Sequence, residues 1–171
     1  VAQFLGSGKE FNCSITLKAQ DTAGGIAQAL GLLEKCITGS MCVLLGDNIF
    51  EDTLTPFVQA YATLYARLDH SAMVVLKEVV QPSRYGVAVF EHGGLSYIEE
   101  KPTEPKSNYA VTGIYFYPGN TVFSYIKNLA FSDRHELEIT DVNNIYAQQH
   151  NLHYVYLPGW WTDAGTLSSY A

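Results

Sequence analysis

The sequence predicts an α/β domain with three layers, in which helices cover both faces of a mixed, mostly parallel sheet. Three observations lead to this fold class. Apolar runs typical of buried strands alternate with helical apolar spacing in the first half, which predicts right-handed βαβ crossovers. A later pair of strands joined by a glycine-rich turn makes the sheet mixed. No repeat, low-complexity tract or linker divides the 171 residues, so we expect one domain over residues 1–171.

The front of the chain is expected to contribute the first strand and helix. Residues 14–20 alternate apolar and polar side chains, which predicts a strand. Gly24-Gly25 then precede a helix. Its apolar face is formed by residues with helical spacing, namely Ile26, Leu30, Leu33 and Ile37.

The next segment repeats the strand and helix pattern. Residues 41–45 form a continuous apolar run, which predicts a strand covered on both faces. Thr55-Pro56 has the residue types of a helix start, a cap followed by a proline in the first turn. Residues 72–76 predict another buried strand.

The second half predicts a hairpin, further strands and two helices. The strands at 86–90 and 95–98 are joined by His92-Gly93-Gly94. The remaining expected elements are a strand at 110–117, a short helix around 122–129, a helix capped by Thr140, a strand at 152–157, and a turn at Pro158-Gly159 leading into 160–163.

Composition excludes several classes of protein. Hydrophobic residues make up 47% and charged residues 16%, which disfavours disorder. The net charge of −7 and the absence of a Lys/Arg cluster argue against a nucleic-acid polymer as partner. No apolar run approaches the ~18 residues that span a bilayer, so we expect no membrane segment. Cys13, Cys36 and Cys42 show no metal or disulfide spacing and are interpreted as buried free thiols. Together with a start unlike a signal peptide, they indicate a cytoplasmic protein.

Two positions near the predicted strand ends are candidates for binding a metal or a nucleotide. Asp47 follows the apolar run at 41–45, at the sheet edge where open parallel sheets bind ligands. Its carboxylate suits Mg²⁺, and a turn or helix-cap aspartate is the alternative. Gly24-Gly25 offer backbone N–H groups to an anion or a base edge, and an ordinary tight turn is the alternative.

Other candidates come from the second half. Lys101 could bind a phosphate and Glu100 could accept hydrogen bonds from sugar hydroxyls, with a solvated charge cluster as the alternative. Tyr85-Gly86 could expose a backbone N–H to a sugar or simply open a strand. Asp163 lies in an aromatic stretch without another charge, where a carboxylate needs a partner or a metal.

Several stretches in series resemble glucose-1-phosphate thymidylyltransferases, within the sugar-1-phosphate nucleotidyltransferases. The resemblance covers essentially the whole chain, and the order of the motifs agrees. They are Gln20-Asp-Thr-Ala-Gly-Gly-Ile-Ala-Gln-Ala29, Leu44-Leu-Gly-Asp-Asn48, Arg84-Tyr-Gly-Val87, Glu99-Glu-Lys-Pro102, Glu104-Pro-Lys-Ser-Asn-Tyr-Ala-Val-Thr-Gly113, Glu136-Leu-Glu-Ile-Thr-Asp141 and Trp160-Trp-Thr-Asp-Ala-Gly-Thr166.

The resemblance implies a Rossmann-like nucleotide-diphospho-sugar transferase fold and a role for each matching residue. The nucleotide would be bound by Gln20, Gly25 and Asp47, and Mg²⁺ would be held by Asp47 and Asp163. The sugar phosphate would be bound by Tyr85, Gly86, Glu100, Lys101 and Val111, with backbone groups prominent at Gly86 and Val111. The residues expected to act in catalysis are Asp47, Lys101 and Asp163.

The implied reaction is nucleotide-sugar biosynthesis. A nucleoside triphosphate, dTTP in first place, and a hexose 1-phosphate, glucose 1-phosphate in first place, would yield a nucleotide sugar and pyrophosphate. Such chemistry depends on positioning and charge neutralisation. That requirement agrees with the lack of a nucleophile arrangement in the sequence.

One departure from the family leaves an alternative open. The family's amino-terminal strand and Gly-rich loop with its Arg and Lys, which hold the triphosphate, have no counterpart in the sequence. We therefore expect a domain truncated at the amino terminus and inactive by itself. A non-catalytic sugar-nucleotide-binding or regulatory module is the alternative. The sequence does not decide the base or the hexose. It also leaves the oligomeric state open, with a homo-oligomer as one alternative.

Overall fold

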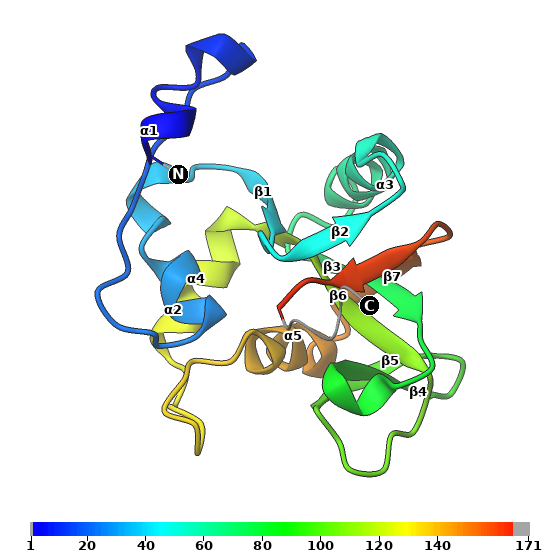
Figure 1. Cartoon of the computed structure of the whole chain (residues 1–171). Coiled ribbons are helices and arrows are strands. Elements are labelled where there is room, and N and C mark those ends of the chain that lie inside the picture. Colours follow the sequence, from blue (N-terminus) through cyan, green and yellow to red (C-terminus); the bar gives the residue numbers. More distant parts are fainter. Residues whose placement is uncertain (1, 166–171) are drawn as a thin grey trace.

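The computed structural model describes residues 2–165 and shows an α/β arrangement around one six-stranded sheet (Figure 1). Its order is β5–β4–β6–β3–β7, and β1 also pairs with β6. The strands of this sheet are β1 (Ser40–Leu44), β3 (Ala72–Glu78), β4 (Gly86–Glu91), β5 (Gly94–Glu100), β6 (Tyr109–Pro118) and β7 (Leu152–Tyr156). A separate two-stranded ribbon consists of β2 (Asn48–Phe50) and β8 (Trp161–Asp163).

The sheet is mixed, as expected, but its pairing corrects the expectation of a mostly parallel sheet. Strands β1, β3 and β4 are all antiparallel to β6, so they share one direction, and β7 is parallel to β3. Because β6 lies between β1 and β3, these two strands do not pair with each other. Among residues 2–165 only β3 and β7 form a parallel pair.

Helices lie on both sides of this sheet, which gives the three layers. The longer helices are α2 (Ile26–Gly31), α3 (Thr55–Tyr65), α4 (Gly119–Lys127) and α5 (Ile139–Gln148), and the short ones are α1 (Ala2–Leu5), η1 (Lys9–Phe11), η2 (Glu34–Cys36) and η3 (Pro82–Arg84). One buried cluster joins α2, α4 and α5 to one face of the sheet, and a second joins α3 to the other face.

The alternation of side chains along a strand explains why two clusters form. On β3, Val74 and Leu76 pack into the cluster under α2, α4 and α5, whereas Met73 and Val75 pack under α3. All four are at most 2% exposed. The continuous apolar run at 72–76 therefore predicted a strand covered on both faces correctly.

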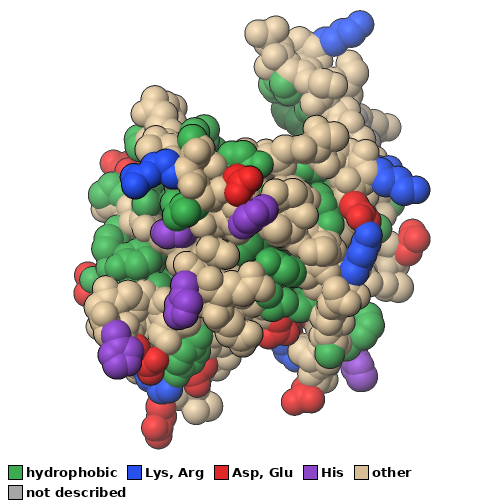
Figure 2. All heavy atoms as spheres, turned by 180° about the vertical axis from the view of Figure 1, so that it is seen from behind, with side chains coloured by type: hydrophobic (Ala, Val, Ile, Leu, Met, Phe, Trp, Pro, Cys, Tyr) green, Lys and Arg blue, Asp and Glu red, His purple; other side chains and the backbone are tan. Residues whose placement is uncertain are grey.

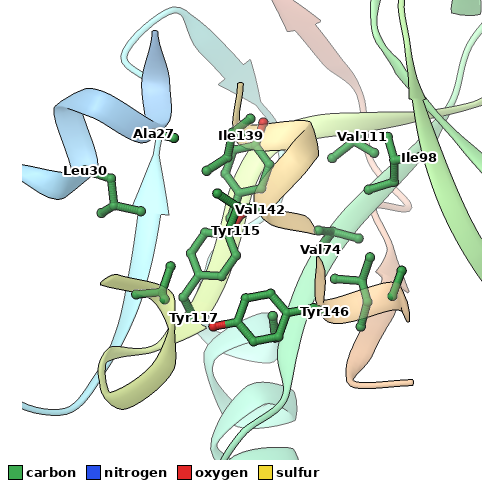
Figure 3. Close-up of a cluster of buried hydrophobic side chains, with 14 of the residues drawn as sticks. Ala27, Leu30, Val74, Ile98, Val111, Tyr115, Tyr117, Ile139, Val142 and Tyr146 are labelled. Carbon is green, nitrogen blue, oxygen red and sulfur yellow. The ribbon is translucent and has the colours of Figure 1, made fainter. Parts of the chain in front are cut away.

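A group of tyrosines fixes α5 against β6 (Figure 3). The rings of Tyr117 and Tyr146 are stacked with centroids 5.9 Å apart, and the Tyr117 hydroxyl donates to Asn143 Oδ1 at 2.6 Å. Buried hydroxyl groups need such partners. The contacts orient α5 so that its first turn faces the ends of β5 and β6.

Three expectations about the front of the chain are wrong. Residues 14–20 form no strand, because alternation alone does not supply a pairing partner, and most of their side chains are exposed. The amino-terminal segment lies apart from the sheet (Figure 1). Strand β1 is covered on one face only, since its burial alternates and Leu44 is 46% exposed. Helix α2 ends at Gly31, although Ile26, Leu30, Leu33 and Ile37 all pack into one cluster.

Other local expectations are also corrected. Thr140 is not the cap of α5, because the helix begins at Ile139 and the Thr140 hydroxyl binds Glu100 instead. The segment at 160–163 contains strand β8. The three cysteines are free thiols but exposed, which contradicts their expected burial.

Basic side chains are dispersed among acidic ones on the face shown in Figure 2. No helix within residues 2–165 is long and apolar enough to cross a membrane. The expectation of one domain over 1–171 stays a prediction.

Candidate active site

A cavity of about 720 Å³ lies where the ends of β1, β5 and β6 meet the ribbon β2–β8 and the first turns of α2 and α5. Every residue that the sequence predicted for the site lines this cavity: Gln20, Gly25, Asp47, Tyr85, Gly86, Glu100, Lys101, Val111 and Asp163. These residues come from segments far apart in the sequence. The fold thus brings the predicted nucleotide, metal and sugar-phosphate residues to one place.

The two aspartates expected to bind metal converge. Asp47 lies in the turn between β1 and β2, and β2 pairs with β8 so that Asn48 is opposite Asp163. The Ala164 N–H donates to the Asp47 carbonyl at 2.7 Å. A Cβ placed on Gly165 would lie 3.3 Å from Asp47 Oδ2 and 3.8 Å from Asp163 Oδ1. Both carboxylates therefore face one small space that glycine leaves open.

This space fits a hard divalent cation. Mg²⁺ is commonly bound by one or two carboxylates and completes its shell with water and substrate phosphates. Within residues 2–165, no group of three or more His, Cys, Asp or Glu side chains could hold a metal. An ion at Asp47 and Asp163 would thus complete its coordination with water or with oxygen atoms of a bound substrate.

Asn48 holds the metal side of the cavity together. Its Nδ2 donates to Asp47 Oδ1 at 2.8 Å, while its Oδ1 accepts from the Gly113 N–H and from Trp161 Nε1, both at 2.8 Å. One amide thus connects β2, β6 and β8. A Cβ on Gly113 would lie 2.5 Å from the Asn48 side chain, so only glycine fits there.

Arg84 and Tyr85 border Asp163 from η3. Arg84 Nη2 lies 3.6 Å from Asp163 Oδ1, and the ring of Tyr85 packs on that of Trp161 with centroids 5.1 Å apart. Burial, together with the Asp163 carboxylate, raises the pKa of Tyr85, and Arg84 opposes this rise. Tyr85 is therefore a neutral hydroxyl in the ordinary pH range.

Glu100 belongs to a second, more closely connected group. Its Oε2 accepts from the Thr140 hydroxyl at 2.6 Å, and its Oε1 lies 3.3 Å from Arg134 Nη2. Arg134 also binds both carboxylate oxygens of Glu138 at 2.9 Å. Gly86 pairs with Glu100 across β4 and β5. A fixed acceptor of this kind suits recognition of a hydroxyl group.

Lys101 follows directly after β5 with a positive φ of 43°, which is uncommon for a residue with a side chain. Its N–H donates to the Tyr85 carbonyl at 3.0 Å, which keeps the two predicted sugar-phosphate segments together. Its ammonium group lies 3.9 Å from Glu100 Oε1 and is half exposed. A cation in this position can reach an anion in the cavity.

Gln20 and Gly25 form another part of the cavity wall. Gln20 Nε2 donates to the Gly25 carbonyl at 3.2 Å and to Gln28 Oε1 at 2.7 Å. Gly25 has φ of 92°, and a Cβ there would lie 2.5 Å from the Leu137 carbonyl oxygen. The backbone therefore requires glycine at this position, which leaves a polar edge open to the cavity.

Sequence reasoning assigned no role to two arginines that line the cavity, Arg84 and Arg134. Arg84 is the first residue of the Arg84–Val87 motif, and Arg134 lies just before the Glu136–Asp141 motif. Their position in or beside a motif is the feature of the sequence that could have pointed to them. Along the cavity, five carboxylates face three basic side chains. One divalent cation would balance this difference.

Comparison with known proteins shows which family the chain belongs to. The profile of the family described as "Nucleotidyl transferase" matches residues 1–171. The chain belongs to this family. It is 40% identical to a glucose-1-phosphate thymidylyltransferase of Neisseria meningitidis and 36% identical to one of Mycolicibacterium smegmatis, in each case over 98% of the chain. It spans 58% of the length of both relatives.

Solved structures agree with the fold. A Bacillus anthracis protein named as a glucose-1-phosphate thymidylyltransferase, solved in complex with sucrose, superposes with a TM-score of 0.89 at 52% identity. The match covers 99% of this chain and 67% of that one. A UDP-glucose pyrophosphorylase complexed with UDP-glucose has a TM-score of 0.80 at 23% identity and shows the fold alone. The expected nucleotidyltransferase fold is confirmed.

Proposed function

We propose that the protein containing this chain transfers a nucleotidyl group from dTTP to glucose 1-phosphate. The observation that carries the proposal is the single cavity in which the predicted nucleotide, metal and sugar-phosphate residues meet. The similarity to glucose-1-phosphate thymidylyltransferases supports the choice of substrates.

In the proposed complex the two substrates occupy opposite ends of the cavity. Gln20 and the backbone at Gly25 bind the edge of the thymine base. Glu100, held by Thr140 and Arg134, accepts hydrogen bonds from sugar hydroxyls. Backbone groups at Gly86 and Val111, with Tyr85, complete the hexose pocket. Lys101 neutralises the phosphate of the sugar.

The reaction is an in-line displacement at phosphorus. An oxygen of the sugar phosphate attacks the α-phosphorus, a new P–O bond forms, and the bond to the β-phosphate breaks as pyrophosphate leaves with the electron pair. The residues of this chain position both reactants. They also offset the negative charges of the two substrates, which would otherwise repel each other. Mg²⁺ bound at Asp47 and Asp163 would supply further charge neutralisation.

Pyrophosphate release by a full-length protein containing this chain tests the proposal. The protein is incubated with Mg²⁺, each of dTTP, UTP, CTP and GTP, and glucose 1-phosphate or mannose 1-phosphate. We expect the fastest release with dTTP and glucose 1-phosphate, together with formation of the nucleotide sugar. Binding of a sugar nucleotide without turnover by any pair would contradict the proposal and favour a non-catalytic binding module.

A further inference from the structure

Arg84 contacts the very oxygen of Asp163 that faces the proposed metal position. The Asp163 oxygen nearest to the open space at Gly165 is Oδ1, at 3.8 Å. The same Oδ1 lies 3.6 Å from Arg84 Nη2. Both side chains line the cavity. A divalent cation that bound Asp163 through Oδ1 would therefore meet the positive guanidinium group directly.

We propose that Arg84 is the exchangeable counter-ion of Asp163. Without a divalent cation, Arg84 neutralises Oδ1, and when a cation binds, Arg84 gives up this oxygen and moves away. The inference rests on the proposed metal position at Asp47 and Asp163 and adds a competitor for it. It makes cation binding depend on a residue that is not itself a metal ligand.

The physical basis is competition between two positive charges for one carboxylate oxygen. A guanidinium group is not deprotonated in proteins, so the exchange proceeds by movement of the side chain and not by loss of a proton. The Arg84 side chain is 39% exposed and that of Asp163 is 21% exposed. An ion pair with this exposure is weak, so a divalent cation can displace it.

The position of Arg84 allows this movement. The residue ends η3, and its guanidinium carbon lies 5.6 Å from the centroid of the Tyr85 ring. An aromatic face can hold a guanidinium group by a cation–π contact. Arg84 already makes this contact in the structure, so the Tyr85 ring can keep holding the guanidinium group inside the cavity when Arg84 gives up Asp163 Oδ1.

A titration of free Mn²⁺, followed by its electron paramagnetic resonance signal, tests the proposal on the full chain without substrates. Arg84→Gln and Arg84→Met, which remove the competing charge, should bind Mn²⁺ roughly three- to five-fold more tightly than wild type. This gain should shrink as salt is added. Arg84→Lys keeps the charge and should stay within about two-fold of wild type.

Two controls separate the inference from its premise. Arg67→Gln removes the same charge from the exposed turn that follows α3, away from the cavity lining, and should leave the Mn²⁺ affinity unchanged. Asp163→Asn should abolish Mn²⁺ binding. Equal or weaker Mn²⁺ binding by both neutral Arg84 variants, with binding still lost in Asp163→Asn, would overturn the inference alone. Binding that is insensitive to Asp163→Asn would overturn the metal position as well.

Discussion

Two groups of carboxylates line the same cavity, and different contacts hold them in place. One group contains Glu100, Glu136 and Glu138, and the other contains Asp47 and Asp163. Glu100 is fixed by protein donors, with the Thr140 hydroxyl at 2.6 Å and Arg134 at 3.3 Å. Asp47 and Asp163 converge on a space that a glycine leaves open, with Arg84 3.6 Å from Asp163. In the proposed function, Glu100 accepts hydrogen bonds from sugar hydroxyls, and Asp47 and Asp163 bind a cation.

This difference follows from where the groups lie in the fold. Glu100 ends β5 and packs against the first turn of α5, an element anchored by the buried tyrosines. Asp47 directly precedes β2 and Asp163 ends β8, so both lie at one end of the short ribbon β2–β8, which is joined to the main sheet through the Asn48 side chain.

The largest effect is expected from Asn48→Ala. This variant leaves the Gly113 N–H and Trp161 Nε1 without their acceptor, and each buried unpaired donor costs about 1–3 kcal/mol. We expect the free energy of unfolding to fall by about 2–4 kcal/mol in a denaturant titration. Since Asp47 also loses its donor, Mn²⁺ binding to the folded variant should weaken by roughly 10–100-fold.

Asn144→Ala is the matched control for this prediction. Asn144 makes two hydrogen bonds to the backbone of Ile98, at 2.7 and 2.8 Å, and does not line the cavity. It should lower stability without changing the Mn²⁺ affinity. Equal Mn²⁺ affinities in both variants would mean that Asn48 has only a structural role.

Lys101→Ala tests the sugar-phosphate side in the full-length enzyme. A charge-assisted contact contributes about 1.5–3 kcal/mol, and part of this one should strengthen in the transition state. We expect a higher Michaelis constant for the sugar phosphate and a slower turnover, measured by pyrophosphate release. Lys106→Ala, on an exposed residue outside the cavity lining, should behave like wild type. Unchanged kinetics in Lys101→Ala would mean that Lys101 is only a solvated charge at the edge of the sheet.

Thr140→Val probes how firmly Glu100 must be held. The substitution keeps the shape of the side chain and removes the donor to Glu100 Oε2. We expect sugar-phosphate affinity to fall by about 1 kcal/mol, or roughly five-fold. The Mn²⁺ affinity should not change, because the two groups are held independently. A parallel loss of Mn²⁺ binding would show that they are coupled.

The smallest effect concerns a group outside both clusters. Burial lowers the pKa of His153 from its ordinary value of 6.5, and His153 Nε2 is buried without a hydrogen-bond partner. The unfolded chain therefore binds more protons just below pH 6.5. The stability contributed by neutral His153 is complete above pH 6.5 and is lost as the pH falls through the lower folded-state pKa.

This loss should be about 0.5 kcal/mol or less, since the side chain is only partly buried. Unfolding free energies at pH 7.5 and 5 measure it in wild type and in His153→Gln, in which the His153 contribution should disappear. His92→Gln, at the exposed hairpin turn, is the control. An identical pH dependence in wild type and His153→Gln would contradict this account.

The sequence predicted the fold best where pattern and environment coincide. The run at 72–76 and the hairpin at 86–98 have their partners within the same sheet, so periodicity was sufficient. Residues 14–20 alternate apolar and polar side chains but have no pairing partner in residues 2–165, and the run at 41–45 is covered on one face only. Periodicity describes a side-chain pattern and cannot show what covers it.

Site residues could be predicted where a motif singled them out. Asp47 and Asp163 are 116 positions apart, and only the resemblance joined them before the β2–β8 pairing brought them together. Thr140 was expected to cap α5, because a threonine before an apolar helical pattern typically does so. Its contact with Glu100, like that of Arg134, depends on packing between α5 and β5, which the linear sequence does not display.

The central claim is that Asp47 and Asp163 hold a divalent cation at one end of the cavity. Paramagnetic broadening of backbone amide signals during a Mn²⁺ titration tests it most directly. Asn48 and Ala164, adjacent to the two carboxylates, should broaden at the lowest Mn²⁺ concentrations, and Glu136 and Glu138 only later. First broadening at Glu136 and Glu138, on the side of Arg134, would place the cation in the other carboxylate group and contradict the account.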